Sequence, residues 1–291
     1  MADHTGIDQF IESVSSGNVD AVQDILKGEN SSSILNQQNG EGRSIFHAAA
    51  ISGQNEILTL LLESDANPNL QDAFLQTPLI LAAEKGVAHT ETVELLSASS
   101  KVELNLQDSF GRTAAHWAAR RGAARALAAL LLREGGGGGG EEGGGPDAAR
   151  TASGETALHW ACQPDPDGAP PAGKLECAQM LLEKGADPLL CNNAGEAALD
   201  KVDPENEEMK TMLQSRIELW KRDKERESLN HLSTNLNPTG EKGNESKAEI
   251  QHSVPPAKVA SSARPGLGGR GNFSMIGAAK KKPKMKITLK K

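Results

Sequence analysis

A nine-residue motif recurs along this chain, and its period constrains the fold more than any other feature. The copies read GRSIFHAAA from Gly42, LQTPLILAA from Leu75, GRTAAHWAA from Gly111 and GETALHWAC from Gly154, and a shorter version, GEAALDKV, begins at Gly195. Their third residues are separated by 33, 36, 43 and 41 positions. A period of this length is typical of stacked units, because one unit alone cannot bury its apolar face. The motif therefore predicts a solenoid of repeats.

A second, leucine-rich motif follows each of the four full copies. It reads EILTLLLESDANPN, ETVELLSASSKVELN, ALAALLLRE and ECAQMLLEKGADP. Leucines with polar residues opposite them predict an amphipathic helix, and the Asn, Asp, Gly and Pro that follow predict a turn. Each unit should comprise a turn, a helix, a second turn and a second helix. The lack of tyrosine and an aromatic content of only 3% also favour helices over a β-sandwich.

The combined pattern, G-x-T-P-L-H-x-A-A followed by a leucine-rich helix and G-A-D-x-N, resembles the ankyrin repeat. Four units match from about Asn39 to Asn193. The resemblance implies an all-α repeat solenoid, an ankyrin-like stack of helix-turn-helix units with β-turn fingers. It also implies that a protein partner binds on the concave face.

The composition of the chain predicts its domain boundaries. We expect a degenerate N-terminal capping repeat over residues 1–38 and four ankyrin-like repeats over residues 39–193. A degenerate last repeat and a charged capping helix, with Asp203 as its N-cap and Pro204 in its first turn, should occupy residues 194–227. Residues 228–291 are rich in Asn, Ser, Gly, Pro and Lys and predict a disordered tail.

Two segments interrupt the repeats, one glycine-rich (135–145) and one proline-rich (164–173). The glycine run invites comparison with a phosphate-binding loop, but that motif needs a preceding strand and a GK[ST] sequence opening a helix. Here a predicted helix precedes the run and no lysine follows it closely. We interpret both segments as insertions, which cost little where they lengthen a surface turn.

The segment GETALHWAC places His159 three residues before Cys162, as a catalytic pair or a metal site would. However, His47 and His116 occupy the same slot in other repeats, each three residues after a Ser or Thr. The resemblance implies that this histidine fastens the start of the helix to the turn. Cys162 stands where the other repeats have alanine, and gaps of 14 and 13 residues separate Cys162, Cys177 and Cys191. Structural zinc sites favour much closer pairs, so we expect no catalytic residue, no metal and no cofactor.

The resemblance places the candidate partner-binding residues at variable positions beside the Thr and after the His. They are Phe74, Phe110, Arg112, Trp117, Arg120, Arg121 and Trp160. Trp117 and Trp160 share a slot in consecutive repeats and should lie side by side. Tryptophan and arginine are enriched among residues that dominate binding energy. The alternative, which the sequence leaves open, is that the indoles simply pack between adjacent helices.

The charge distribution separates an acidic body from a basic end. Residues 250–291 contain ten basic and no acidic residues, so residues 1–249 carry 21 basic against 39 acidic side chains. The KKKPK segment, with Lys280, Lys281, Lys282 and Lys284, resembles a short nuclear import signal. The alternatives are a solvated basic tail and one that contacts nucleic acid or the acidic body.

The remaining features bear on location and function. The odd number of cysteines and the opening MADHTGIDQF, which does not resemble a secretory signal, favour a reducing intracellular setting. The longest apolar run, AARALAALLL, is too short for a membrane span. We expect a soluble monomer of the nucleus or cytoplasm that is not secreted. The predicted function is a non-enzymatic protein–protein interaction adaptor, the alternatives being a nucleic-acid-associated protein that binds through its lysine-rich tail, and a regulatory subunit of an enzyme.

Overall fold

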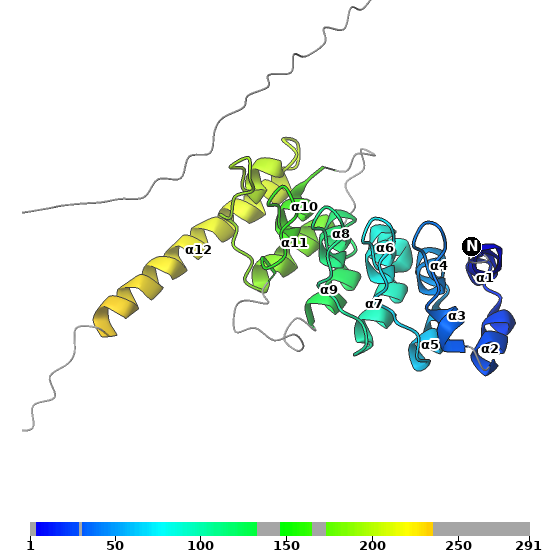
Figure 1. Cartoon of the computed structure of the whole chain (residues 1–291). Coiled ribbons are helices and arrows are strands. Elements are labelled where there is room, and N and C mark those ends of the chain that lie inside the picture. Colours follow the sequence, from blue (N-terminus) through cyan, green and yellow to red (C-terminus); the bar gives the residue numbers. More distant parts are fainter. Residues whose placement is uncertain (1–3, 29–30, 133–145, 165–172, 235–291) are drawn as a thin grey trace, which may run out of the picture. The chain divides into compact units, whose positions relative to one another are not determined.

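A computed structural model describes residues 4–28, 31–132, 146–164 and 173–234, and it confirms the predicted all-α repeat solenoid (Figure 1). The described residues contain no β-strand. The elements are α1 (His4–Ser15), α2 (Val19–Lys27), α3 (Ser31–Leu35), α4 (Ile45–Ser52), α5 (Asn55–Glu63), α6 (Pro78–Glu84), η1 (Gly86–His89), α7 (Thr90–Ala98), α8 (Ala114–Arg120), α9 (Ala124–Leu132), α10 (Ala157–Cys162), α11 (Lys174–Glu183), η2 (Ala198–Lys201) and α12 (Glu207–Thr234).

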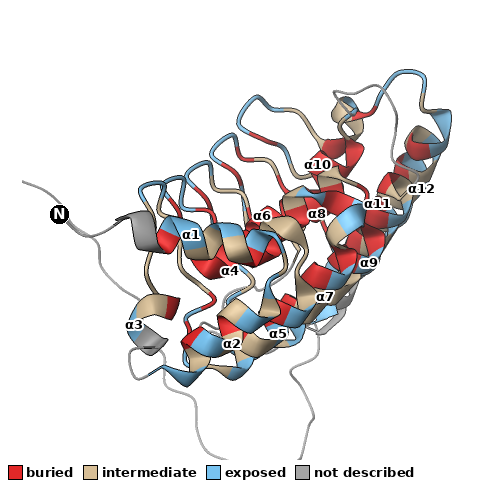
Figure 2. Ribbon diagram, turned by 90° about the vertical axis from the view of Figure 1, so that its right-hand side faces the viewer, coloured by how far each residue is buried: buried red, intermediate tan, exposed pale blue. Residues whose placement is uncertain are grey.

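The helices form two rows, as Figures 1 and 2 show. The inner row comprises α1, α4, α6, α8, α10 and η2, each in contact with the next, and the outer row comprises α2, α5, α7, α9, α11 and α12. Of the inner helices, α4, α6, α8 and α10 are short and rich in alanine, and Ala49, Ala82, Ala118 and Ala161 are completely buried. Small side chains let neighbouring helices pack closely, while the leucines of the outer row fill the space between the rows.

The turns that precede the inner helices, which we call finger turns, span residues 39–43, 72–76, 108–112, 151–155 and 192–196. In each, an Asn, Asp or Thr side chain accepts one or two backbone N–H groups from residues further along the turn, as Asp108 Oδ1 does from Phe110 and Arg112. Backbone hydrogen bonds also join each finger turn to the next, from Ala73 to Glu41, from Ser109 to Phe74, from Ala152 to Phe110 and from Asn193 to Ser153. Adjacent repeats are thus held in a fixed register.

One residue of each finger turn adopts a left-handed backbone conformation. Glycine occupies this place in four turns, as Gly111 does with a φ of 75°. In the second finger turn the place is taken by Leu75, with a φ of 59°. A side chain at such a φ costs on the order of 1 kcal/mol relative to glycine. The LQTPLILAA copy therefore lacks the leading glycine of the motif but keeps its backbone path.

The long final helix begins later than the sequence predicts. The side chain that caps it is that of Asn206, whose Oδ1 accepts the backbone N–H of Met209 at 3.0 Å. Asp203 instead shapes the preceding turn, because its Oδ1 accepts the backbone N–H of Glu205. Met209 and Leu213 are buried against the last repeat, as expected for the apolar stripe of an end cap.

Several predictions fall outside the described residues. These are the glycine-rich insertion, most of the proline-rich one, residues 235–291 of the predicted tail and, within them, the import segment at Lys280–Lys284. The expected start of the tail at residue 228 is wrong, because residues 228–234 belong to α12. Of the helices in the described part of the chain, none is both long and apolar enough to cross a membrane.

Candidate protein-binding surface

Three histidines hold the finger turns to the inner helices and to the next repeat. The Nδ1 atoms of His47, His116 and His159 each accept the backbone N–H of the Ser or Thr three residues earlier, at 3.0, 3.2 and 3.3 Å. Their Nε2 atoms lie 3.1, 3.2 and 3.1 Å from backbone carbonyls of the following repeat, those of Gln76, Glu155 and Glu196. Because a carbonyl only accepts, the proton must be on Nε2. This geometry agrees with the predicted fastening role of the histidine. It also shows a bond that was not predicted, from Nε2 to the following repeat.

Burial makes these imidazoles poor candidates for acid–base chemistry. His47 and His116 have 0% and 1% of their surface exposed. Removal from water lowers the pKa of His47, and it lowers the pKa of His116 to about 4, since the charged form loses hydration. Both side chains are neutral at physiological pH, with both ring nitrogens engaged.

The cysteines of the repeats are buried small side chains. Burial raises the pKa of both Cys162 and Cys177 to about 12, so neither forms the thiolate that a nucleophile or a metal ligand requires. Cys191 is exposed, and all three cysteines are free thiols. No group of three or more metal-binding side chains converges within the described residues.

The two indoles of the inner row pack against each other. The rings of Trp117 and Trp160 are 5.3 Å apart in an edge-to-face arrangement with an interplanar angle of 82°. Their positions therefore agree with the side-by-side placement expected from the shared slot. Only 8% and 7% of their surfaces are exposed, so each indole presents little of its surface to the exterior.

Arginines stack on these rings. The guanidinium carbon of Arg112 lies 4.6 Å from the ring centre of Phe110 and 4.8 Å from that of Trp117, while Arg120 lies 5.1 Å from that of Trp160. Such stacking is favourable because the face of an aromatic ring is electron-rich. We call Phe110, Arg112, Trp117, Arg120 and Trp160 the aromatic–arginine cluster.

A hydrogen-bonded network continues the cluster across the last repeat. Glu155 accepts hydrogen bonds from Trp160 Nε1 and Gln163 Nε2, both at 3.0 Å, and it lies 3.4 Å from Lys201. Burial alone would raise the pKa of Glu155, but the hydrogen bond from Trp160 and the contact with Lys201 outweigh it and lower the pKa. Glu155 is therefore an anion whose oxygens are already engaged.

The tips of two adjacent finger turns form the most exposed apolar surface near the cluster. Phe74, Leu75 and Phe110 have 60%, 48% and 56% of their surfaces exposed, and the backbone bond from Ser109 to Phe74 joins the two turns at this point. We call these three residues the fingertip patch. Clusters of exposed apolar side chains are a common feature of protein interaction sites.

Of the seven predicted binding residues, six lie in this region and Arg121 does not join them. Its Nε donates to the backbone carbonyl of Glu84 at 2.9 Å, so it caps the end of α6. Two residues that were not predicted, Gln163 and Lys201, link Arg120 and Glu155 to the network. Lys201 occupies the slot of Trp117 and Trp160 in the shorter motif, which could have identified it.

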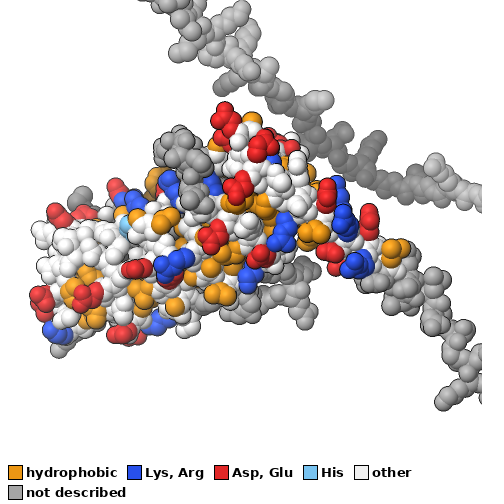
Figure 3. All heavy atoms as spheres, turned by 180° about the vertical axis from the view of Figure 1, so that it is seen from behind, with side chains coloured by type: hydrophobic (Ala, Val, Ile, Leu, Met, Phe, Trp, Pro, Cys, Tyr) orange, Lys and Arg blue, Asp and Glu red, His pale blue; other side chains and the backbone are white. Residues whose placement is uncertain are grey.

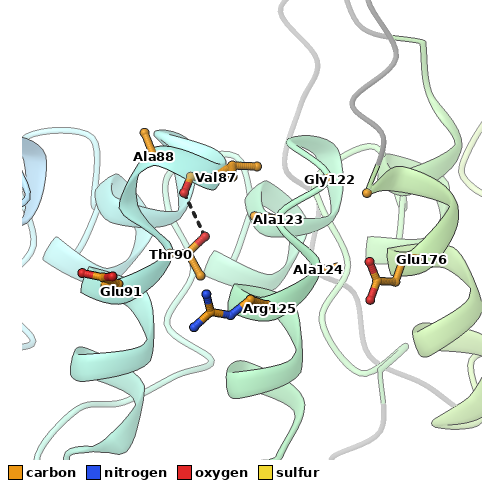
Figure 4. Close-up of a pocket in the computed structure, with 10 residues that line it drawn as sticks. Val87, Ala88, Thr90, Glu91, Gly122, Ala123, Ala124, Arg125 and Glu176 are labelled. Atoms are coloured by element: carbon orange, nitrogen blue, oxygen red, sulfur yellow. Dashed lines mark hydrogen bonds between the residues drawn. The ribbon is translucent and has the colours of Figure 1, made fainter.

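A concavity of about 660 Å³ lies where α7, α9 and α11 begin (Figure 4). Its lining consists largely of small side chains, and Arg125 lies between Glu91 and Glu176 in the view of Figure 4. Arg125 pairs with Glu94 of the preceding repeat, and its side chain is 75% exposed. On the face seen in Figure 3, acidic and basic side chains are interspersed with hydrophobic ones. The residues that line this concavity form no arrangement of catalytic type.

Comparison with known proteins agrees with the architecture. The family model "Ankyrin repeats (3 copies)" matches residues 10–108 and 79–192. The solved structure of EF0377, an ankyrin repeat protein, superposes with a TM-score of 0.57 at 21% identity, over 72% of this chain and 97% of that one. The fold defines a helical repeat protein of the solenoid type. The family match covers more than half of the chain, which belongs to the ankyrin repeat family.

This chain corresponds to only part of the length of the relatives that it matches. The putative E3 ubiquitin-protein ligase XBAT31 of Arabidopsis thaliana is 31% identical over 191 residues, which are 62% of this chain and 37% of that protein. Alpha-latrotoxin-Lhe1a of Latrodectus hesperus is 39% identical over 89 residues, which are 30% of this chain and 6% of the toxin. Ankyrin repeats are generally protein–protein interaction modules, and the fold is typically non-enzymatic.

Proposed function

We propose that this chain is a non-enzymatic adaptor that binds a protein partner through the fingertip patch and the aromatic–arginine cluster. The observation that carries the proposal is the exposure of Phe74, Leu75 and Phe110 on two hydrogen-bonded finger turns. An aromatic side chain that is more than half exposed gains most from burial by a partner, since apolar area removed from water contributes roughly 25 cal/mol per Å². The cluster beside it supplies arginine and tryptophan, the residue types enriched at binding hot spots.

The alternative of an enzyme receives no support from the groups in the described residues. The buried histidines have both ring nitrogens engaged, and the thiols of Cys162 and Cys177 are protonated. One relative is named a putative E3 ubiquitin-protein ligase, but this chain corresponds to just over a third of that protein. The shared segment therefore supports a common interaction module rather than a common activity.

Affinity capture followed by mass spectrometry tests the proposed surface. The full chain, a Phe74→Ser/Phe110→Ser variant and a Val87→Ser variant serve as baits in an extract of the source cells. Val87 is 66% exposed and lies in η1, away from the finger turns, so it controls for general loss of apolar surface. We expect the double variant to lose specific partners that the control keeps. Retention of every partner by the double variant would contradict the proposed surface.

The basic tail is proposed to direct the protein to the nucleus through Lys280, Lys281, Lys282 and Lys284. A fluorescent fusion of the full chain is compared with one in which these four lysines are replaced by glutamine. We expect nuclear enrichment that the replacement abolishes. An unchanged distribution would remove the tail from the proposal and leave the binding surface unaffected.

A further inference from the structure

The two tryptophans of the aromatic–arginine cluster differ in one hydrogen bond. Trp160 Nε1 donates to Glu155 Oε2 at 3.0 Å, and Glu155 stands directly before Thr156, the helix-capping residue of its repeat. The residue in that place in the preceding repeat is Arg112. Trp117 Nε1 is buried and has no hydrogen-bond partner among the residues that the structure describes. The repeat that contains Trp117 therefore lacks the acceptor that Trp160 uses.

Arginine cannot supply the missing acceptor, because a guanidinium group only donates. A buried donor without a partner costs on the order of 1–3 kcal/mol, and native proteins rarely leave one unpaired. Only 8% of Trp117 is exposed, and Arg112 stacks on its ring. A group that enters beside that arginine can supply the acceptor that the described residues do not.

The surroundings of Trp117 offer further donors. Arg112 forms an ion pair through Nε with Oδ2 of Asp108, whose side chain is buried. Its two terminal nitrogens make no hydrogen bond with the described residues, so they remain for another acceptor. Arg120 donates to the neutral amide oxygen of Gln163, and no carboxylate neutralises it in that contact. Glu155, the acid of the next finger turn, is already engaged by Trp160, Gln163 and Lys201. Donors exceed acceptors at this point of the surface.

We propose that Trp117, Arg112 and Arg120 form a subsite for the carboxylate of an Asp or Glu side chain in a partner protein, which takes the place that Glu155 fills beside Trp160. This inference rests on the proposed function and adds the chemical class of the partner. One carboxylate oxygen accepts from Trp117 Nε1 and the other from a terminal nitrogen of Arg112, whose flexible stem lets the guanidinium shift aside. Charge-assisted bonds of this kind are stronger than neutral ones.

The fingertip patch defines what lies next to the acid. Phe110 belongs to both the patch and the cluster, because Arg112 stacks on its ring. A partner segment that places a carboxylate on Trp117 therefore brings neighbouring residues over Phe74, Leu75 and Phe110. The recognised segment should carry an acidic residue beside an apolar one.

A random peptide library displayed on phage and panned against the full chain tests this proposal. We expect enriched peptides to share an Asp or Glu next to an apolar residue. A synthetic peptide of the enriched sequence is then compared with its Glu→Gln or Asp→Asn counterpart. We expect the affinity of the amide peptide to be lower by a factor of about 10 or more. The indole N–H resonance of Trp117 should move on titration with the acidic peptide only.

Variants of the full chain separate the subsite from the rest of the surface. Trp117→Phe keeps an aromatic ring and removes the N–H donor, and Arg112→Gln removes the positive charge. Each should lower the affinity for the acidic peptide roughly 5-fold to 50-fold. Trp220→Phe on α12 and Arg125→Gln on α9 are matched controls that should leave the affinity unchanged. Circular dichroism checks that every variant is folded.

The outcomes distinguish this proposal from the proposed function. Enriched peptides without an acid, bound through Phe74 and Phe110, would overturn the carboxylate subsite and keep the binding surface. Acidic peptides that bind Trp117→Phe and Arg112→Gln as tightly as the unaltered chain would overturn it as well. If no peptide is enriched, both proposals are rejected.

Discussion

The Nε2 atom of His116 lies 3.2 Å from the backbone carbonyl oxygen of Glu155, a residue 39 positions further along the chain. The same imidazole is fastened to Thr113 through Nδ1, with the hydroxyl oxygen at 2.9 Å. One buried ring therefore joins the cap of its own helix to the finger turn of the next repeat. Ile80 occupies this slot in the second repeat, and its side chain cannot make either bond.

This relationship predicts strong coupling between the two residues. Thr113→Val and His116→Leu should each lower the free energy of unfolding by about 1–3 kcal/mol, since each leaves a buried partner unsatisfied. The double variant should lose about 1 kcal/mol less than the sum, because both changes remove the same interaction. Urea denaturation of the four proteins measures these values. Strict additivity would show that the hydroxyl and the imidazole act independently.

Stability should decrease as the pH falls below about 7. The pKa of His116 is about 4 in the folded chain because of burial, against about 6.5 when unfolded. The unfolded state therefore binds a proton first, and the stabilisation present above pH 6.5 is lost as the pH falls towards 4. For His116 alone we expect a loss of about 2 kcal/mol between pH 7.5 and pH 5.

His47, whose pKa burial also lowers, should add to this effect. Urea denaturation at several pH values gives the slope, and His116→Leu serves as the comparison. That variant should be less stable at pH 7.5 but lose less on acidification. An equal slope in both proteins would mean that His116 titrates alike in the folded and unfolded states.

Gly173 should tolerate no side chain. A Cβ atom at this position would collide with the backbone oxygen of Gly122, and a backbone atom cannot move aside as a flexible side chain can. We expect Gly173→Ala to lower the free energy of unfolding by about 2–4 kcal/mol. Gly40→Ala is the control, since nothing lies within 4 Å of its Cβ, and it should change stability by less than about 0.5 kcal/mol.

The three thiols should differ sharply in reactivity. Cys162 and Cys177 are buried with pKa values of about 12, whereas Cys191 is exposed. A thiol reagent at pH 8 should therefore modify Cys191 rapidly and the other two only after unfolding in urea. Mass spectrometry of the digested protein identifies the modified residues. Rapid labelling of Cys162 in the folded chain would reopen the question of a nucleophile.

The sequence predicted the repeat architecture because each structural role recurs at the same motif position. The slot shared by His47, His116 and His159 indicated a fastening residue, and the slot shared by Trp117 and Trp160 predicted their contact. These predictions succeed because neighbouring repeats contact each other in the same way. The family match confirms the assignment to ankyrin repeats.

Side-chain directions within the site could not be predicted in this way. Arg120 and Arg121 are adjacent in sequence, yet one stacks on Trp160 and the other bonds to the carbonyl of Glu84. The direction of each side chain depends on the ring or carbonyl that a neighbouring repeat places beside it, and the motif of one repeat does not contain this information. The start of α12 was misplaced because Asp203 and Asn206 are both good caps, and the sequence alone does not distinguish the one that caps the helix from the one that shapes the preceding turn.

The ladder of finger turns has a consequence for how the chain can change. Successive motifs are separated by 33, 36, 43 and 41 residues, yet each finger turn bonds to the next through one backbone N–H. The bond between successive finger turns is therefore kept whatever number of residues separates them. The length of a repeat can therefore change while its finger turn keeps the same bond to the next one. A partner that contacts several finger turns would meet them in the same register.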